Sequence, residues 1–219
     1  MEPMQIERVY IVRHGETDYN ATGRWQGALD IPLNALGRQQ AAHLAQYLHS
    51  QGETVDRICT SDLTRARETA DIVAQAFGLE AHVELRLRET NVGVFQGLTN
   101  HEIDAQHAAI RHLWNNDDDY VIPTGESRNQ VKQRMMEVWH EWTGHLALRH
   151  LMIVSHGGAI RWLLRGLFPN IDHDSYHLPN TSLTIVQRTE TGWTLERVGT
   201  VIHLPTDLGN LPSETMKNL

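Results

Sequence analysis

Residues 6–20, IERVYIVRHGETDYN, join an apolar run to a charged turn. Val9-Tyr10-Ile11-Val12 has the composition of a buried strand, and Arg13 and His14 follow directly at its end. Neither of these two side chains belongs in a core without a partner. The stretch therefore predicts a strand that delivers an arginine and a histidine to the place where a partner can meet them.

A second apolar run ends in the same way. Leu151-Met152-Ile153-Val154 is followed by Ser155-His156-Gly157-Gly158, and a shorter strand, Asp56–Thr60, leads into a helix that carries Arg65. Strands that alternate with helices predict an α/β fold with a mostly parallel sheet. Ligands of such folds bind beyond the carboxyl ends of the strands, so we expect these three elements to converge on one site.

The remaining pattern completes one domain over residues 1–204, followed by a C-terminal tail, 205–219. Ser61 or Asp62 is expected to cap the helix that carries Arg65, and Gly78 to end it. Further elements are expected as follows: helices from Asn34 to Leu48, from Thr99 (short), from Val131 to Leu146 and from Ile160 to Leu167; strands at His82–Leu87, Thr181–Arg188 and Trp193–Val201; and a loop at Asn115–Gly125.

The composition is that of a globular protein with an acidic surface. The 219 residues are 40% hydrophobic and 21% charged, with a formal net charge of −8, which argues against nucleic acid or an anionic membrane as a partner. Cys59 is the single cysteine, so an intramolecular disulfide and a cysteine zinc cluster are excluded. With neither a signal peptide nor a membrane span recognisable, we expect a cytoplasmic protein.

The converging side chains suit a phosphorylated substrate. Arg13 and Arg65 offer planar forks that match phosphoryl oxygens, and His156 can add a further positive charge. His14, when neutral, can attack phosphorus, and a protonated carboxyl group can donate to the leaving oxygen. Glu89 is the preferred acid, with Glu16 and Glu84 as the alternatives.

The order of four motifs resembles the histidine phosphatase superfamily, also called the phosphoglycerate mutase-like family. The motifs are Arg13-His14-Gly15-Glu16-Thr17 with Asn20, Ser61-Asp62-Leu63-Thr64-Arg65-Ala66 with Thr69, Leu87-Arg88-Glu89 with Gly93 and Gly97, and Ser155-His156-Gly157-Gly158. The resemblance spans roughly residues 6–190 and implies a three-layer α/β/α arrangement around the sheet. Gly125-Glu126-Ser127 also resembles a segment of this family, although Thr124 stands where a glycine is common.

The resemblance also implies roles for residues. His14 would be the nucleophile that forms a phosphohistidine, and Glu89 the general acid and then the base. The phosphoryl group would be held by Arg13, Arg65, His156, the backbone N–H of Gly157, and Asn20, which could instead cap a turn. No metal and no cofactor would be required, and a homodimer is familiar among related proteins.

We interpret the chain as a phosphoric monoester hydrolase acting on a small phosphorylated metabolite. The alternatives are a 2,3-bisphosphoglycerate-dependent phosphoglycerate mutase and a catalytically silent binder of phospho-ligands. The segment between Glu89 and His156 is short for a typical mutase of this family, which favours a phosphatase. Gln26, close after the RHGE motif, is either a substrate contact or an ordinary loop residue. The cluster Asp172-His173-Asp174 with His177 is interpreted as a solvated loop rather than a metal site.

Overall fold

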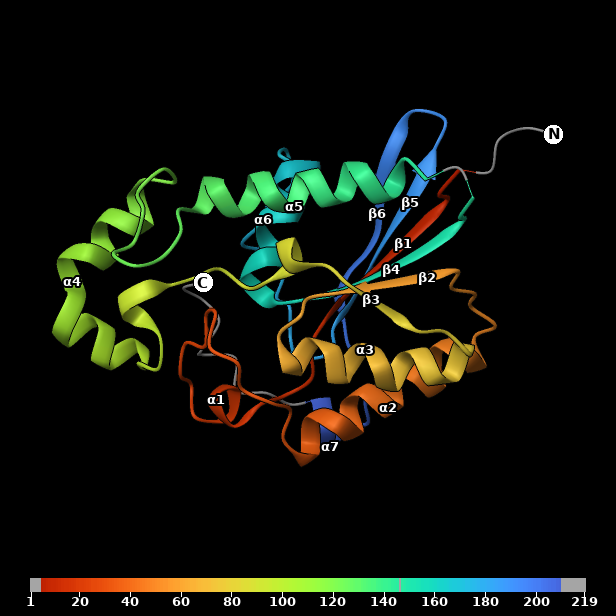
Figure 1. Cartoon of the computed structure of the whole chain (residues 1–219), viewed down its shortest axis with the longest axis horizontal. Helices are drawn as coiled ribbons and strands as arrows, with labels where there is room; N and C mark the ends of the chain where they lie inside the picture. Colours follow the sequence, from red (N-terminus) through yellow and green to blue (C-terminus); the bar gives the residue numbers. More distant parts are fainter. Residues whose placement is uncertain (1–4, 146, 210–219) are drawn as a thin grey trace.

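The computed structural model describes residues 5–145 and 147–209, which form a six-stranded sheet in the order β3-β2-β4-β1-β5-β6 with helices on both faces (Figure 1). The first four strands along the chain run parallel, whereas β5 is antiparallel to β1, and β6 to β5. The strands are β1 (Arg8–Arg13), β2 (Arg57–Thr60), β3 (Ala81–Val83), β4 (His150–Ser155), β5 (Leu183–Thr189) and β6 (Gly192–Thr200). The predicted α/β fold with a mostly parallel sheet is confirmed.

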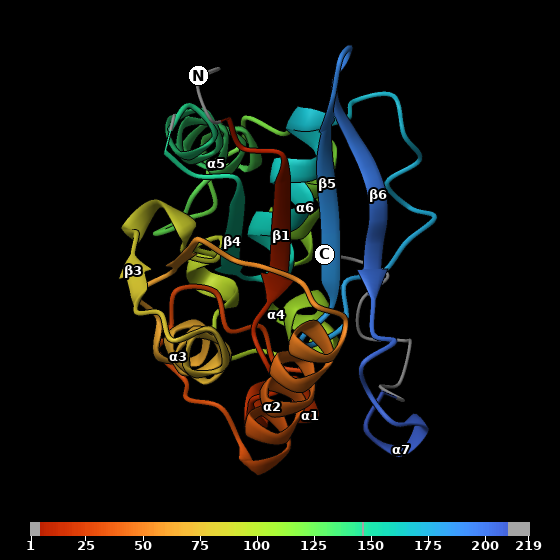
Figure 2. The same ribbon diagram turned by 90° about the vertical axis from the view of Figure 1, so that its right-hand side faces the viewer.

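Helices α2 and α3 cover one face of the sheet, and α5 and α6 cover the other (Figures 1 and 2). The helices are α1 (Asp18–Ala21), α2 (Ala35–Ser50), α3 (Thr64–Phe77), α4 (Asn100–Asn116), α5 (Arg128–Thr143), α6 (Gly157–Leu167) and α7 (Thr206–Gly209), with 3-10 turns η1 (Leu85–Leu87) and η2 (Gly93–Phe95). The short α7 lies at the start of the expected tail, and the rest of that tail, like Leu146, lies outside the described residues. None of the helices in the described ranges has the length and apolar character needed to cross a membrane.

The two central strands are apolar throughout because both of their faces are buried. In β1, Val9 and Ile11 belong to the core under α5 and α6, whereas Tyr10 and Val12 belong to the core under α2 and α3. β4 alternates in the same way along its length. With both faces covered, the polar residues that follow these strands can lie only at the sheet edge, which is where the site forms.

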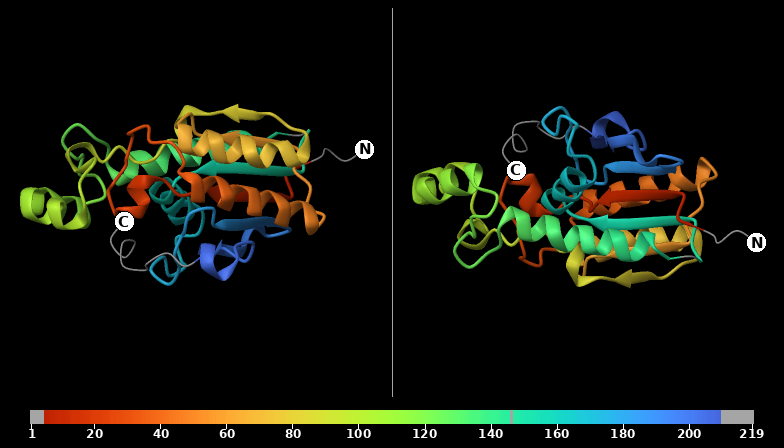
Figure 3. Two further views of the ribbon diagram at one scale, coloured as in Figure 1. Left: turned by 90° about the horizontal axis from the view of Figure 1, so that it is seen from below. Right: turned by 90° about the horizontal axis from the view of Figure 1, so that it is seen from above.

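A third, smaller core lies around α4. It consists of Trp25, Val92, Phe95, Ile103, Trp114 and Ile122. In Figures 1 and 3, α4 lies at one end of the molecule, the end towards which β1 leads. Trp25 ties this unit to the loop after His14, because its backbone N–H donates to the carbonyl of Leu98 at 2.9 Å.

Four expected features differ from the structure. The third strand is only Ala81–Val83, because the side chain of Glu84 accepts the backbone N–H of Arg86 and turns residues 85–87 into η1. Leu63, not Ser61 or Asp62, is the N-cap of α3, and Asp30 from a distant loop accepts the N–H of Thr64 at 2.6 Å.

The helix after Thr99 has the expected capping box but runs for 17 residues, with non-helical dihedral angles at His107. The loop expected from Asn115 to Gly125 therefore begins only after Asn116.

Candidate active site

The ends of β1 and β4 bring two histidines together. The strands are paired with Arg13 opposite Ser155, so His14 and His156 follow side by side. The His14 backbone N–H donates to the carbonyl of Ser155 at 2.9 Å, and the two ring centroids lie 5.1 Å apart at an interplanar angle of 59°. Both rings are buried, with exposed fractions of 2% and 0%. The convergence predicted from the two apolar runs is confirmed.

The hydrogen bonds assign opposite tautomers to these two rings. Nδ1 of His14 lies 2.6 Å from the carbonyl oxygen of Gly15, which can only accept, so Nδ1 carries the proton and Nε2 has a free lone pair. Nδ1 of His156 accepts from Nε of Arg65 at 3.2 Å, so the proton of this ring is on Nε2. Nε2 of His156 has no hydrogen-bond partner among the described residues. One ring can therefore attack and the other can donate.

Two buried arginines flank the histidines. The guanidinium of Arg65 donates to the carbonyls of Leu29 (2.6 Å) and Gly27 (2.8 Å), and that of Arg13 donates to the carbonyl of Leu178 (2.6 Å). Burial lowers the pKa of each arginine to about 10, so both stay protonated at neutral pH. These contacts hold two positive charges beside the rings.

Burial and the two arginines keep both histidines neutral. Desolvation, followed by the charges of Arg65 and Arg13, holds the pKa of His14 well below the ordinary value of histidine. The pKa of His156 is lowered in the same direction, first by burial and then by Arg65. Across the physiological pH range, therefore, His14 presents an unprotonated Nε2.

Glu89 lies at the amino end of α6. Its carboxylate accepts backbone N–H groups of Gly158 (3.0 Å) and Ala159 (2.9 Å), and of Thr90 (2.8 Å). The approach depends on the glycine, because a Cβ at Gly158 would lie 2.7 Å from Oε1 of Glu89. The helix N-terminus favours a carboxylate there.

The alternative acids are engaged elsewhere. Oε1 of Glu16 accepts from the side chain of Asn34 at 2.9 Å, and Glu84 forms an ion pair with Arg86 at 2.7 Å. Glu89 is the carboxylate among these three that shares the start of α6 with His156 and Gly157. This position favours Glu89 as the acid.

Asn20, Gln26 and Gly157 lie at defined positions. Oδ1 of Asn20 accepts from the backbone of Thr17 and from the side chain of Asn180, both at 3.2 Å, so Asn20 does cap the turn that begins α1. Gln26 is buried, and its Oε1 has no partner in the described part of the chain. Gly157 is the first residue of α6, directly after His156. Contacts of these residues with a substrate stay predictions.

Sequence reasoning missed Asn180. Its Nδ2 donates to the carbonyls of His14 and Gly15, both at 3.1 Å, and the backbone N–H of Thr181 also donates to the carbonyl of His14 at 3.1 Å. These bonds fix the backbone on which His14 stands. The antiparallel pairing of β5 with β1 places the polar residues before β5 beside the end of β1, and no motif in the sequence marks this pairing.

Two glycines bring α2 against the loop after His14. A Cβ at Gly15 would lie 2.4 Å from the carbonyl oxygen of Gly37, and one at Gly37 would lie 2.1 Å from that of Glu16. The backbones are therefore in direct contact. The small size of these residues sets the position of the RHGE loop over the helix.

In residues 5–145 and 147–209, no three His, Cys, Asp or Glu side chains form a group that could hold a metal ion. His173, at the centre of the cluster Asp172-His173-Asp174 with His177, uses both ring nitrogens within the protein. Nδ1 pairs with the hydroxyl of Tyr176 at 2.7 Å, and Nε2 with the carbonyl of Phe168 at 2.9 Å. This histidine is a structural residue.

The fold and the site together define an α/β protein with paired, buried histidines and arginines at the carboxyl edge of its sheet. The sequence pattern of the histidine phosphatase superfamily (branch 1) matches residues 9–201. The chain therefore belongs to the histidine phosphatase superfamily, as its motifs predicted.

Relatives within the superfamily include both phosphatases and mutases. Glucosyl-3-phosphoglycerate phosphatase of Mycolicibacterium vanbaalenii is 37% identical over 171 residues, which cover 75% of this chain and 75% of that protein. Probable phosphoglycerate mutase GpmB of Serratia proteamaculans is 37% identical over 207 residues, or 91% and 95%. The structure of mycobacterial glucosyl-3-phosphoglycerate phosphatase with VO3 matches with a TM-score of 0.77 at 34% identity, covering 87% of this chain and 97% of that one.

Proposed function

We propose that the chain is a phosphatase that hydrolyses phosphate monoesters through a phosphohistidine on His14. The observation that carries this proposal is the pair of opposite tautomers: a free Nε2 on His14 beside an Nε2–H on His156. The two ring centres lie 5.1 Å apart, so both rings can act on one phosphoryl group, His14 at phosphorus and His156 at a phosphoryl oxygen.

In the first step, Nε2 of His14 attacks phosphorus and the P–O bond to the leaving group breaks. Glu89, which takes up a proton when the negatively charged phosphoryl group binds beside it, gives this proton to the leaving oxygen. Such a proton transfer supplies ~10²–10⁴-fold in rate, whereas phosphate monoester hydrolysis needs accelerations up to ~10²¹-fold. Most of the effect must come from charge compensation, which Arg13 and Arg65 provide together with the N–H groups of His156 and Gly157.

In the second step, water attacks the phosphohistidine. Glu89, now a carboxylate, takes the proton of the water, the N–P bond to His14 breaks, and inorganic phosphate leaves. Glu89 is protonated again and His14 is neutral again, so both groups return to their starting states. These two steps use the side chains of the chain and water.

The substrate is a small phosphorylated metabolite. The name of the mycobacterial relatives makes a glycosylated phosphoglycerate the first candidate, with Asn20 and Gln26 as expected contacts. The buried, free Cys59 agrees with a cytoplasmic location, which stays a prediction. A homodimer also stays a prediction. The relative named a probable phosphoglycerate mutase supports the alternative activity, a 2,3-bisphosphoglycerate-dependent mutase.

The test is a panel of phosphate esters: p-nitrophenyl phosphate, glucosyl-3-phosphoglycerate and the phosphoglycerates. We expect release of inorganic phosphate that His14→Ala abolishes and His49→Ala, at an exposed histidine of α2, leaves unchanged. Release that survives His14→Ala would refute the nucleophile. Interconversion of phosphoglycerates that needs bisphosphoglycerate, without phosphate release, would establish the mutase. Binding without either reaction would establish the silent binder.

A further inference from the structure

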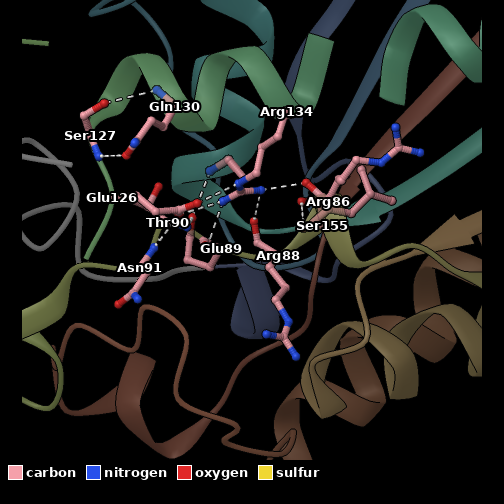
Figure 4. Close-up of polar contacts among 12 residues, drawn as sticks. Arg86, Arg88, Glu89, Thr90, Asn91, Glu126, Ser127, Gln130, Arg134 and Ser155 are labelled. Carbon is pink, nitrogen blue, oxygen red and sulfur yellow. Dashed lines mark hydrogen bonds and ion pairs between the residues drawn. The ribbon is translucent and has the colours of Figure 1, made fainter. Parts of the chain in front are cut away.

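The backbone that carries Glu89 is held by side chains from other elements (Figure 4). Arg134 of α5 donates to three carbonyls: Nη1 to Arg86 (2.6 Å) and Arg88 (2.7 Å), and Nη2 to Glu89 (3.1 Å). The hydroxyl of Ser155 donates to the carbonyl of Leu87 at 2.7 Å. Four consecutive carbonyls are thus fixed from outside, which a strand or a helix would otherwise do through its own backbone.

Arg134 is itself fixed by Glu126. Nε of Arg134 donates to Oε1 of Glu126 and Nη2 donates to Oε2, both at 3.0 Å, in a bidentate pair. With the three carbonyls, this pair uses all five N–H groups of the guanidinium. The side chains of Arg134 and Glu126 are 16% and 27% exposed, so water screens the pair only partly.

Glu126 also holds the far side of Glu89. Its Oε2 accepts the backbone N–H of Asn91 at 2.9 Å, and its own N–H donates to the carbonyl of Asn91 at 2.8 Å. Gly125 allows this approach, because a Cβ there would lie 2.3 Å from the carbonyl oxygen of Asn91. The pair Arg134–Glu126 therefore fixes the chain both before and after Glu89.

We propose that Arg134, held by Glu126, is a positioning residue for Glu89: it sets the place of the carboxyl group relative to the leaving oxygen. This inference rests on the proposed role of Glu89 as the acid. A misplacement of about 1 Å in a catalytic group costs up to ~10²-fold in rate. Five hydrogen bonds from one rigid guanidinium fork are a means of preventing such a shift.

A positioning role and a merely structural role differ in their dependence on the leaving group. An alkoxide leaves only with a proton, so phosphoryl transfer from an alkyl ester to His14 depends on Glu89, whereas p-nitrophenolate leaves without a proton. The value of kcat/KM reports this first transfer step. Loss of positioning therefore lowers kcat/KM for alkyl phosphates selectively, and general damage to the fold lowers it for both kinds of ester.

The experiment measures kcat/KM for glycerol phosphate and p-nitrophenyl phosphate in the full-length protein. The variants are Arg134→Ala, Arg134→Lys, Glu126→Gln and, as the reference for a missing acid, Glu89→Gln. Arg128→Ala is the matched control: Arg128 is also on α5 and donates to the carbonyl of Asn115 at 3.1 Å and to Asp118, away from the segment of Glu89.

For the alkyl ester we expect Glu89→Gln to lose ~10²–10³-fold and Arg134→Ala ~10–10²-fold, with losses below about 3-fold for p-nitrophenyl phosphate. Arg134→Lys and Glu126→Gln should show the same selectivity to a smaller degree, and they carry the test if Arg134→Ala does not fold. Arg128→Ala should affect both esters equally.

Equal losses for the two esters in the Arg134 and Glu126 variants, with a selective loss in Glu89→Gln, would overturn the positioning role alone. Full activity of Arg134→Lys would also overturn the positioning role, because a positive charge without the five hydrogen bonds of the guanidinium would then be sufficient. An unselective loss in Glu89→Gln would overturn the acid itself, and with it the role of Arg134.

Discussion

Replacing Gly37 by alanine tests whether backbone contact between α2 and the RHGE loop sets the site. The new Cβ would lie 2.1 Å from the carbonyl oxygen of Glu16 and 2.7 Å from its nitrogen, and van der Waals contact begins at 3.4 Å. Helix and loop must therefore separate by about 1 Å. Both contacts are backbone atoms, so no side-chain rotation relieves them.

The cost of this separation falls on stability and on catalysis. Overpacking of this kind costs about 1–3 kcal/mol, offset by about 0.5–1 kcal/mol that alanine contributes over glycine within a helix. For a chain of this size, a net loss of about 1–2 kcal/mol lowers Tm by roughly 2–8 °C. The loop carries His14, so we also expect kcat/KM to fall ~10–10²-fold at temperatures where the variant is folded.

The assay combines a thermal melt with phosphate release from p-nitrophenyl phosphate. The matched control is Gly166→Ala in α6, where the new Cβ would lie 2.7 Å from the sulfur of Met136, a flexible side chain that can turn away. The control should stay within about 1 kcal/mol of the parent and keep its activity. If Gly37→Ala kept both Tm and kcat/KM, the close contact would not position the loop.

Three further predictions concern pH, backbone strain and the support of the nucleophile. Because the pKa values of His14 and His156 are lowered in the folded state, the unfolded chain takes up protons that the folded chain does not as the pH falls below about 6.5. Urea denaturation from pH 7 to 5 should therefore show the free energy of unfolding falling by up to ~1.4 kcal/mol per pH unit for each histidine, and a pH dependence unchanged in His14→Gln would contradict this. Thr124 has φ +63°, a left-handed conformation that disfavours a β-branched residue, so Thr124→Gly should raise Tm by an amount equivalent to about 0.5–1 kcal/mol; a lowered Tm would count against strain there. Asn180→Asp places a carboxylate against two carbonyls, so it should reduce kcat/KM more than Asn180→Ala does, and the reverse order would show that these hydrogen bonds do not support His14.

The parts of the fold that the sequence predicted are those that burial dictates. Val9–Val12 and Leu151–Val154 are apolar because two different cores cover their two faces. The sequence therefore predicted both that these segments are strands and how long they are. The strand expected at His82–Leu87 was wrong beyond Val83. A contact between the side chain of Glu84 and the next turn, together with Arg134 from α5, decides that segment, and neither contact leaves a periodic pattern.

The candidate site divides in the same way. His14, His156 and Arg65 were predictable because they follow strands that meet at one sheet edge. Asn180 and Arg134 were not, because they act on backbone carbonyls, and any residue type can offer a carbonyl. In the sequence, Thr124 differs from the family only by standing where a glycine is common, and its positive φ supplies the physical reason for that glycine.

The central claim is that a phosphoryl group passes through His14. Its most direct test is rapid quenching of the protein with radiolabelled p-nitrophenyl phosphate, followed by peptide mapping under alkaline conditions. We predict label on His14 that accumulates in Glu89→Gln, because the hydrolysis of the phosphohistidine lacks its base, and label absent from His14→Ala. Turnover without label on His14, or label on another residue, would contradict the account.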